Sequence, residues 1–134
     1  MTVEQKGKFY IIYKDSESFK RCRFTIAHEL GHIFLGHLLT AVPAYACRTF
    51  VARNDLESSA NVFARDLLAP ACVLHELGTT SPEDIAKHCD ISLEAAQIRA
   101  ARLWLLEERN AWYQSPLERK VHKSFKRFIE KEKE

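Results

Sequence analysis

The 134-residue chain lacks long apolar runs and is poor in glycine and proline, with four of each. No segment reaches the roughly 18 consecutive apolar residues of a transmembrane helix, and the opening MTVEQKGKFYIIYKD has no apolar core of the signal-peptide type. The cysteines, Cys22, Cys47, Cys72 and Cys89, form no Cys-x-x-Cys pair, which argues against a zinc ribbon or a thioredoxin-like redox site. We therefore expect a cytoplasmic protein with free thiols and no membrane partner.

The remaining composition is that of a globular protein, with 46% apolar and 28% charged residues. The length predicts a single domain over residues 1–134. Residues 115–134 hold seven of the 20 lysines and arginines but only four of the 18 acidic residues, so this segment is basic and the rest is nearly neutral.

The first half of the chain predicts an α+β fold. Residues 2–14 are typical of an antiparallel β-hairpin, because Lys6-Gly7 can form the turn and FYIIY is rich in β-forming residues. Apolar residues at helical spacing predict a helix over residues 19–39. We expect residues 41–53 to be irregular with a short strand near 48–52, and a second helix to run from residue 54 or 55 to residue 68, before Pro70.

The second half predicts helices only. Ser81 followed by Pro82 marks the start of a short helix, and Ser92 caps a second that extends to about residue 110. A last amphipathic helix is expected over residues 117–131. The chain would thus consist of a core with the hairpin and the first two helices (1–75), a helical pair (81–110) and a basic C-terminal helix (115–134).

The pentapeptide HELGH, residues 28–32, lies within the first predicted helix. Positions i and i+4 of a helix differ by about 40° in azimuth, so the side chains of His28 and His32 point in the same direction and can bind one metal ion. Glu29 would stand beside the bound water as general base. Gly31 has no side chain and would leave the helix surface open beside the site. The alternative is a helix with two half-buried histidines that bind nothing, because the pattern specifies few positions.

A catalytic zinc also needs a third protein ligand. The extended HExxHxxGxxH pattern is excluded, because Leu35 and Leu38 stand where it requires Gly and His. Glu57 on the following helix shares a face with small and apolar residues and is the predicted third ligand. The alternative is that Glu57, in the first turn of that helix, only interacts with the helix dipole and binds no metal. Asn61, one turn later, would support a ligand imidazole through its second nitrogen.

Other polar side chains are weaker candidates. His37 would be turned about 140° from His32 on a continuous helix, which favours a surface or packing role. His75 and His88 have no motif around them. The group that stabilises the oxyanion stays open among His75, Tyr10, Tyr13 and Tyr45.

Together, RFTIAHELGHIFLGH (residues 23–37) and ESSANVFARDLLAP (residues 57–70) resemble the ImmA/IrrE family of metallopeptidases. The resemblance implies a minimal zincin-like, gluzincin-type fold, in which the hairpin packs on the two active-site helices. It implies one Zn²⁺ per chain, held by His28, His32 and Glu57, with Glu29 as the catalytic acid and base. It also implies a regulatory endopeptidase, as in phages and mobile elements, whose substrate is a helix-turn-helix repressor of the XRE type or an antitoxin-like partner.

A rival function comes from residues 81–103, which have the outline of a helix-turn-helix. The chain would then be a non-catalytic module that binds DNA or a repressor. Against direct nucleic-acid binding, this segment is not clearly basic and Glu94 stands at the start of the presumed recognition helix. The basic residues near the C-terminus are equally typical of a solvated helix face. Metal identity also stays open, because His₂Glu sites accept Mn, Co or Ni.

Overall fold

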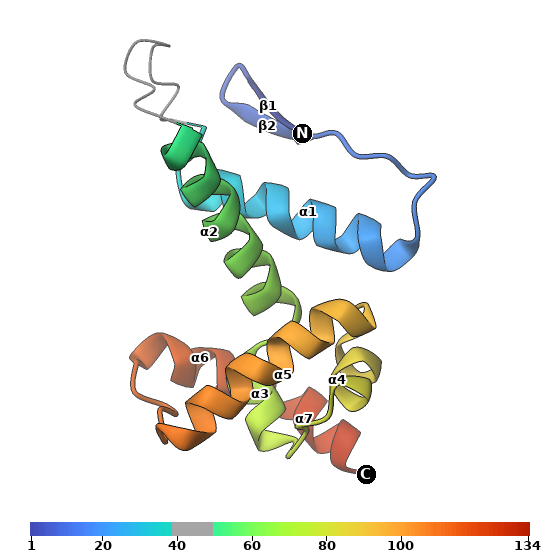
Figure 1. The fold of residues 1–134 in the computed structure, drawn as a ribbon, viewed down its shortest axis with the longest axis vertical. Coiled ribbons are helices and arrows are strands. Elements are labelled where there is room, and N and C mark those ends of the chain that lie inside the picture. The colour runs from blue at the N-terminus through green and yellow to red at the C-terminus, as the bar shows by residue number, and fades with distance from the viewer. Residues whose placement is uncertain (39–49) are drawn as a thin grey trace. The chain divides into compact units, whose positions relative to one another are not determined.

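The computed structural model describes residues 1–38 and 50–134, with side chains described in the second range from residue 55 onward. The chain divides into two compact units, Met1–Leu67 and Leu68–Glu134. A two-stranded antiparallel sheet precedes a series of helices, which confirms the predicted α+β class (Figure 1). The single-domain interpretation stays a prediction. No described helix combines the length and the apolar character that a membrane span requires.

The first unit begins with the predicted hairpin. Strand β1 (Thr2–Gln5) pairs with β2 (Lys8–Ile11), with Gln5 opposite Lys8 at the turn. Lys6 and Gly7 form the turn with φ of 53° and 74°. Positive φ at both central residues is typical of a type I′ turn, whose twist matches that of the two hairpin strands. Both strands contact helix α1, so the hairpin is held beside the HELGH helix.

Helix α1 (Phe19–Phe34) carries HELGH and is shorter than the sequence predicts. Ser18 caps its start, and its hydroxyl accepts a hydrogen bond from the backbone N–H of Arg21 at 3.4 Å. The helix ends at Phe34 instead of residue 39 because Gly36 takes the left-handed conformation, with φ of 75°. The N–H of Gly36 then bonds to the carbonyl of Ile33 at 3.1 Å, and the next N–H bonds to the carbonyl of His32 at 2.9 Å. This pair of bonds is a Schellman motif, which reverses the chain.

Helix α2 (Phe50–Leu68) starts about one turn earlier than predicted. The strand expected near residues 48–52 is wrong for residues 50–52, which are helical, while residues 48 and 49 and the irregular segment from residue 41 lie outside the described residues. Aromatic and β-branched residues favour strands only where they pack on a sheet. The sheet described here consists of the hairpin strands alone.

The two helices of the first unit pack closely through small residues. Gly31 of α1 is buried, and a Cβ atom placed on it would lie 3.1 Å from the Cα of Ala60 and 3.2 Å from the Cβ of Phe63. Ala27, Ala60 and Ala64 are also buried. Gly31 therefore serves the helix contact, which corrects its predicted role of keeping the site open.

The second unit is helical and has its own core. It consists of α3 (Ala71–Glu76), α4 (Pro82–Cys89), α5 (Leu93–Glu108), α6 (Pro116–Ser124) and α7 (Lys126–Lys133). The predicted caps are present, because the hydroxyls of Ser81 and Ser92 accept backbone N–H groups in the first turns of α4 and α5. The main core cluster contains Ala69, Leu74, Ile85, Ile91, Ala96 and Leu103.

The single helix predicted over residues 117–131 is wrong, because Phe125 separates α6 from α7. The apolar face expected from the spacing of Leu117, Val121, Phe125 and Phe128 is only partly buried. Leu117 is 72% exposed and Val121 and Phe125 are each 37% exposed, whereas Phe128 is partly buried beside Ile129, which is 5% exposed. In α7, Ile129 packs with Cys72 and Val73.

Candidate metal centre

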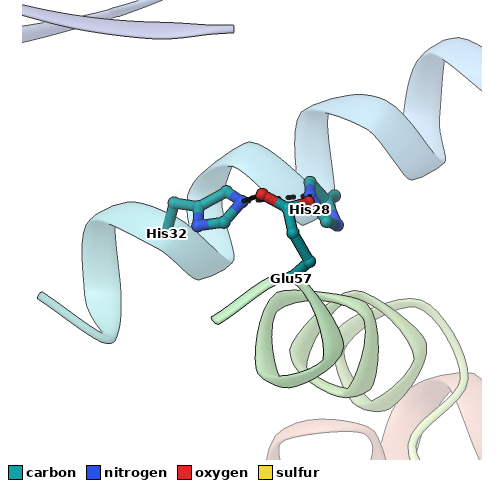
Figure 2. A group of neighbouring side chains, drawn as sticks. All are labelled: His28, His32 and Glu57. Carbon is teal, nitrogen blue, oxygen red and sulfur yellow. Dashed lines mark hydrogen bonds and ion pairs between the residues drawn. The ribbon is translucent and has the colours of Figure 1, made fainter. Parts of the chain in front are cut away.

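Three side chains of the first unit converge on one point, as Figure 2 shows. His28 Nε2 lies 3.1 Å from Glu57 Oε2, and His32 Nε2 lies 3.4 Å from Glu57 Oε1. The two Nε2 atoms are 3.0 Å apart, and one donor atom from each residue lies within 4.8 Å of the others. Two imidazole nitrogens and a carboxylate oxygen are the donor set of His₂Glu zinc sites, so these residues could hold a metal ion.

The close contact between the two helices brings this cluster together. Gly31 precedes His32 on α1, and Ala60 follows Glu57 by three residues, on the same face of α2. Because Gly31 touches Ala60, the carboxylate of Glu57 faces the histidines of α1. Both imidazoles are mostly shielded, at 16% and 13% exposure, whereas Glu57 is 52% exposed. The cluster therefore has one side accessible to solvent.

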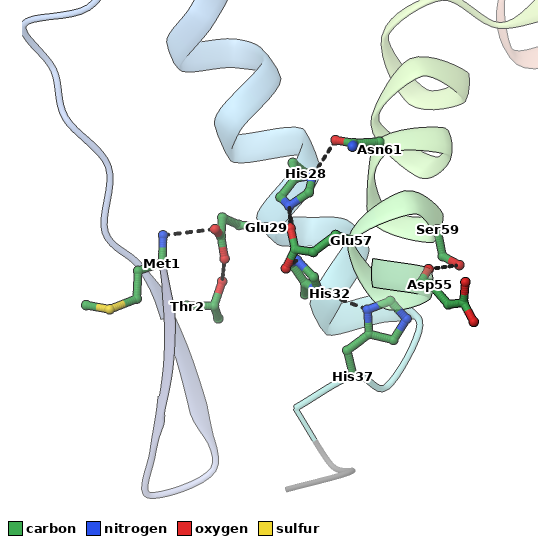
Figure 3. A network of polar contacts seen from close by, with 10 residues as sticks. All are labelled: Met1, Thr2, His28, Glu29, His32, His37, Asp55, Glu57, Ser59 and Asn61. Carbon is green, nitrogen blue, oxygen red and sulfur yellow. Dashed lines mark hydrogen bonds and ion pairs between the residues drawn. The ribbon is translucent and has the colours of Figure 1, made fainter. Parts of the chain in front are cut away.

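The second nitrogen of each imidazole also has a partner (Figure 3). His28 Nδ1 lies 2.9 Å from Asn61 Oδ1, so Asn61 is within reach of this imidazole, and its support of a metal ligand stays a prediction. His32 Nδ1 lies 2.8 Å from His37 Nδ1, a contact that the sequence interpretation missed. The 140° separation assumed a helix continuing through residue 37, but the reversal at Gly36 returns His37 to the site. Burial, and next the neighbouring His32, lower the pKa of His37 below its ordinary value.

Glu29 lies beside the cluster and is engaged by the hairpin (Figure 3). Its Oε2 accepts a hydrogen bond from the Thr2 hydroxyl at 2.5 Å, and its Oε1 lies 2.9 Å from the ammonium group of Met1. Burial acts to raise the pKa of Glu29, but the Thr2 hydrogen bond and the Met1 charge outweigh it, so this pKa lies below its ordinary value. Glu29 is thus an ionised carboxylate at neutral pH. No local sequence signal marks Thr2.

A family comparison identifies the kind of protein that carries this arrangement. The family model Peptidase_M78, described as the IrrE N-terminal-like domain, matches residues 4–101. The chain belongs to this family. The predicted ImmA/IrrE resemblance is thereby confirmed, and the matched region contains HELGH, Glu57 and Asn61. Comparisons with curated proteins and with solved structures return no match.

The other polar candidates in this IrrE-like chain have different surroundings. His75 Nδ1 lies 2.5 Å from Glu107 Oε1, and its ring stacks on Trp112 with centroids 4.1 Å apart. His88 Nδ1 lies 2.5 Å from Glu132 Oε2. Both pairs link helices of the second unit. Tyr10 and Tyr13 are exposed, and Tyr45 lies outside the described residues, so the choice of oxyanion partner stays open.

Proposed function

We propose that this chain is a zinc-dependent endopeptidase. The observation that carries the proposal is the convergence of His28, His32 and Glu57 within a chain of a peptidase family. When bound, zinc supplies Lewis-acid chemistry, which polarises a peptide carbonyl and makes water a stronger acid. The His₂Glu donor set fits zinc, and Mn, Co or Ni are the alternatives that a metal analysis distinguishes.

The chain's own residues would prepare the ligands. A neutral imidazole binds a metal through one nitrogen and carries a proton on the other. The Nδ1–H group of His28 can donate a hydrogen bond to Asn61 Oδ1, 2.9 Å away. The lone pair of His28 Nε2 then points at the cluster. Glu57 adds a negative charge next to both Nε2 atoms, which favours a cation there.

Glu29 would act as general base and then general acid. It follows a ligand histidine directly, and its carboxylate is ionised at neutral pH, so it can take a proton from the attacking water and pass it to the leaving amine. Each carboxylate oxygen has more than one acceptor site. Thr2 and Met1 can therefore keep the carboxylate in place while one oxygen accepts the proton.

The proposed substrate is a helix-turn-helix repressor of the XRE type or a related antitoxin-like partner. Support comes from the resemblance to ImmA/IrrE metallopeptidases, whose members cleave such repressors, and from the family match over residues 4–101. Cleavage of a transcriptional repressor would take place in the cytoplasm. Direct binding of nucleic acid is no part of this proposal.

The first experiment measures metal content by mass spectrometry on protein purified without added metal. The wild type should contain about one zinc per chain, and Glu57→Gln should lose most of it. Asp66→Asn is the matched control, because Asp66 is an exposed acidic residue on the same helix and its substitution removes the same charge. Equal zinc in Glu57→Gln and in the control would contradict the ligand set.

A second experiment separates catalysis from binding. Glu29→Gln should keep the metal but cleave XRE-type repressors on the order of 10²- to 10⁴-fold more slowly than the wild type. The rival function is a non-catalytic binding module built on residues 81–103. It would be favoured if the wild type takes up no zinc at neutral pH and a His28→Ala/His32→Ala variant binds DNA in a salt-dependent manner.

A further inference from the structure

His37 contacts His32 because of how helix α1 ends. Gly36, in the left-handed conformation, turns the chain, and the backbone N–H of His37 bonds to the carbonyl of His32 at 2.9 Å. The same two residues then meet through their side chains, with Nδ1 atoms 2.8 Å apart and ring centroids 5.0 Å apart. One residue pair is thus joined through both backbone and side chain.

We propose that His37 is a positioning residue that holds His32 in the tautomer able to bind the metal. The inference rests on the proposed function, because it concerns a ligand of that site. The main observation behind it is the contact between the two Nδ1 atoms, because Nδ1 is the ring nitrogen of His32 that does not face His28 and Glu57.

The protons of this contact follow from the geometry. Two ring nitrogens at hydrogen-bond distance cannot both point an N–H at each other, so one donates and the other accepts. His32 Nε2 faces the cluster, 3.0 Å from His28 Nε2 and 3.4 Å from Glu57 Oε1. If this nitrogen is to offer its lone pair to a metal, His32 must carry its proton on Nδ1. His37 Nδ1 is then the acceptor, and the proton of His37 sits on its Nε2.

The chemical character of this acceptor sets His32 apart from many metal-bound histidines. The common partners of such a ring are a carboxylate, a backbone carbonyl or a water. Here His28 has the amide oxygen of Asn61, and His32 has an imidazole. Both acceptors are neutral, so they orient the ligand rings without adding negative charge. The only carboxylate of the three-ligand set is Glu57 itself.

The test compares two substitutions of His37. Asn places its Oδ1 close to where His places Nδ1, so His37→Asn keeps an acceptor, whereas His37→Leu removes it. Zinc affinity is measured by competition with a chromophoric chelator. Loss of an outer partner of a metal ligand typically weakens binding about 10- to 100-fold, which is the effect expected for His37→Leu. His37→Asn should bind within a few-fold of the wild type.

A spectroscopic measurement distinguishes positioning from packing. In the zinc-loaded wild type, ¹⁵N-labelled imidazoles should show a His32 Nδ1–H proton that exchanges slowly and resonates downfield. That proton should persist in His37→Asn and exchange fast in His37→Leu, with circular dichroism spectra alike in all three proteins. Wild-type affinity together with an unchanged Nδ1–H signal in His37→Leu would overturn the inference alone. Failure of the wild type to bind zinc would overturn the proposed function along with it.

Discussion

Replacing Gly31 with alanine perturbs the site without touching a ligand. The added Cβ would lie 3.1 Å from the Cα and 3.2 Å from the carbonyl oxygen of Ala60, both backbone atoms, so α2 has to move away by a few tenths of an ångström. Glu57 lies on the same helix, three residues before Ala60, and must move with it. Metal–ligand distances in good sites lie within about 0.2 Å of their standard values, so a shift of a few tenths should weaken zinc binding. We expect a loss on the order of tenfold, the lower end of what disturbing a ligand's support typically costs.

The effect on stability has two opposing parts. In an exposed helix, exchanging Gly for Ala stabilises by about 1 kcal/mol. Overpacking a close contact costs about 1 to 3 kcal/mol, so Gly31→Ala should lower the free energy of unfolding of the metal-free protein by roughly 0 to 2 kcal/mol. The expected result is therefore a modest loss of stability combined with a clear loss of zinc affinity.

Urea unfolding of the metal-free protein and chelator competition measure the two quantities. Ser58→Ala is the control, because Ser58 is exposed on α2 next to Glu57 and its substitution should leave zinc affinity unchanged. A Gly31→Ala variant that gains about 1 kcal/mol and binds zinc like the wild type would refute the reasoning. It would mean that the two helices do not approach as closely in solution.

Substitutions at three further positions test local structure. Tyr113→Phe removes the hydrogen bond that is the largest cause of the lowered pKa of Glu76. Because the pKa of Glu76 is lower in the folded protein than the unfolded value of 4.5, its ionised form stabilises the folded state above that pH. The variant should therefore be less stable than the wild type by about 1 kcal/mol at pH 7. This difference should vanish as the pH falls through the folded pKa. Lys6→Asn should raise the melting temperature, because Asn tolerates the positive φ of this turn better and gains up to about 1 kcal/mol. Ser92→Ala should cost about 1 kcal/mol in urea unfolding and Ser92→Gly only a few tenths, since the hydroxyl caps α5.

Features that depend on positions within one helix could be predicted from the sequence. The shared direction of His28 and His32 follows from their spacing of four residues. The same spacing places Asn61 on the face of Glu57, and both observed contacts, Asn61 to His28 and Glu57 to the histidines, agree with that geometry.

Features that depend on where a helix ends, or on contacts between distant residues, could not be predicted. The contact of His37 requires the reversal at Gly36, and extending the helical period through that glycine placed the ring on the wrong side. The break at Phe125 divides a stretch whose apolar spacing is regular, so the spacing over residues 117–131 does not mark it. Thr2 reaches Glu29 across 27 residues, so no local pattern indicates it.

The two glutamates of the site differ in surroundings, and this difference supports different roles. Glu57 directs both oxygens at imidazole nitrogens and is 52% exposed, which fits its proposed role as a metal ligand. Glu29 is 14% exposed, and its oxygens face a hydroxyl and an ammonium group. Those donors stabilise the charged form and lower its pKa, so Glu29 stays available to accept a proton. Exchanging either glutamate for glutamine removes one charge, yet only the change at Glu57 should empty the metal site, because only Glu57 lies where the three donor atoms converge.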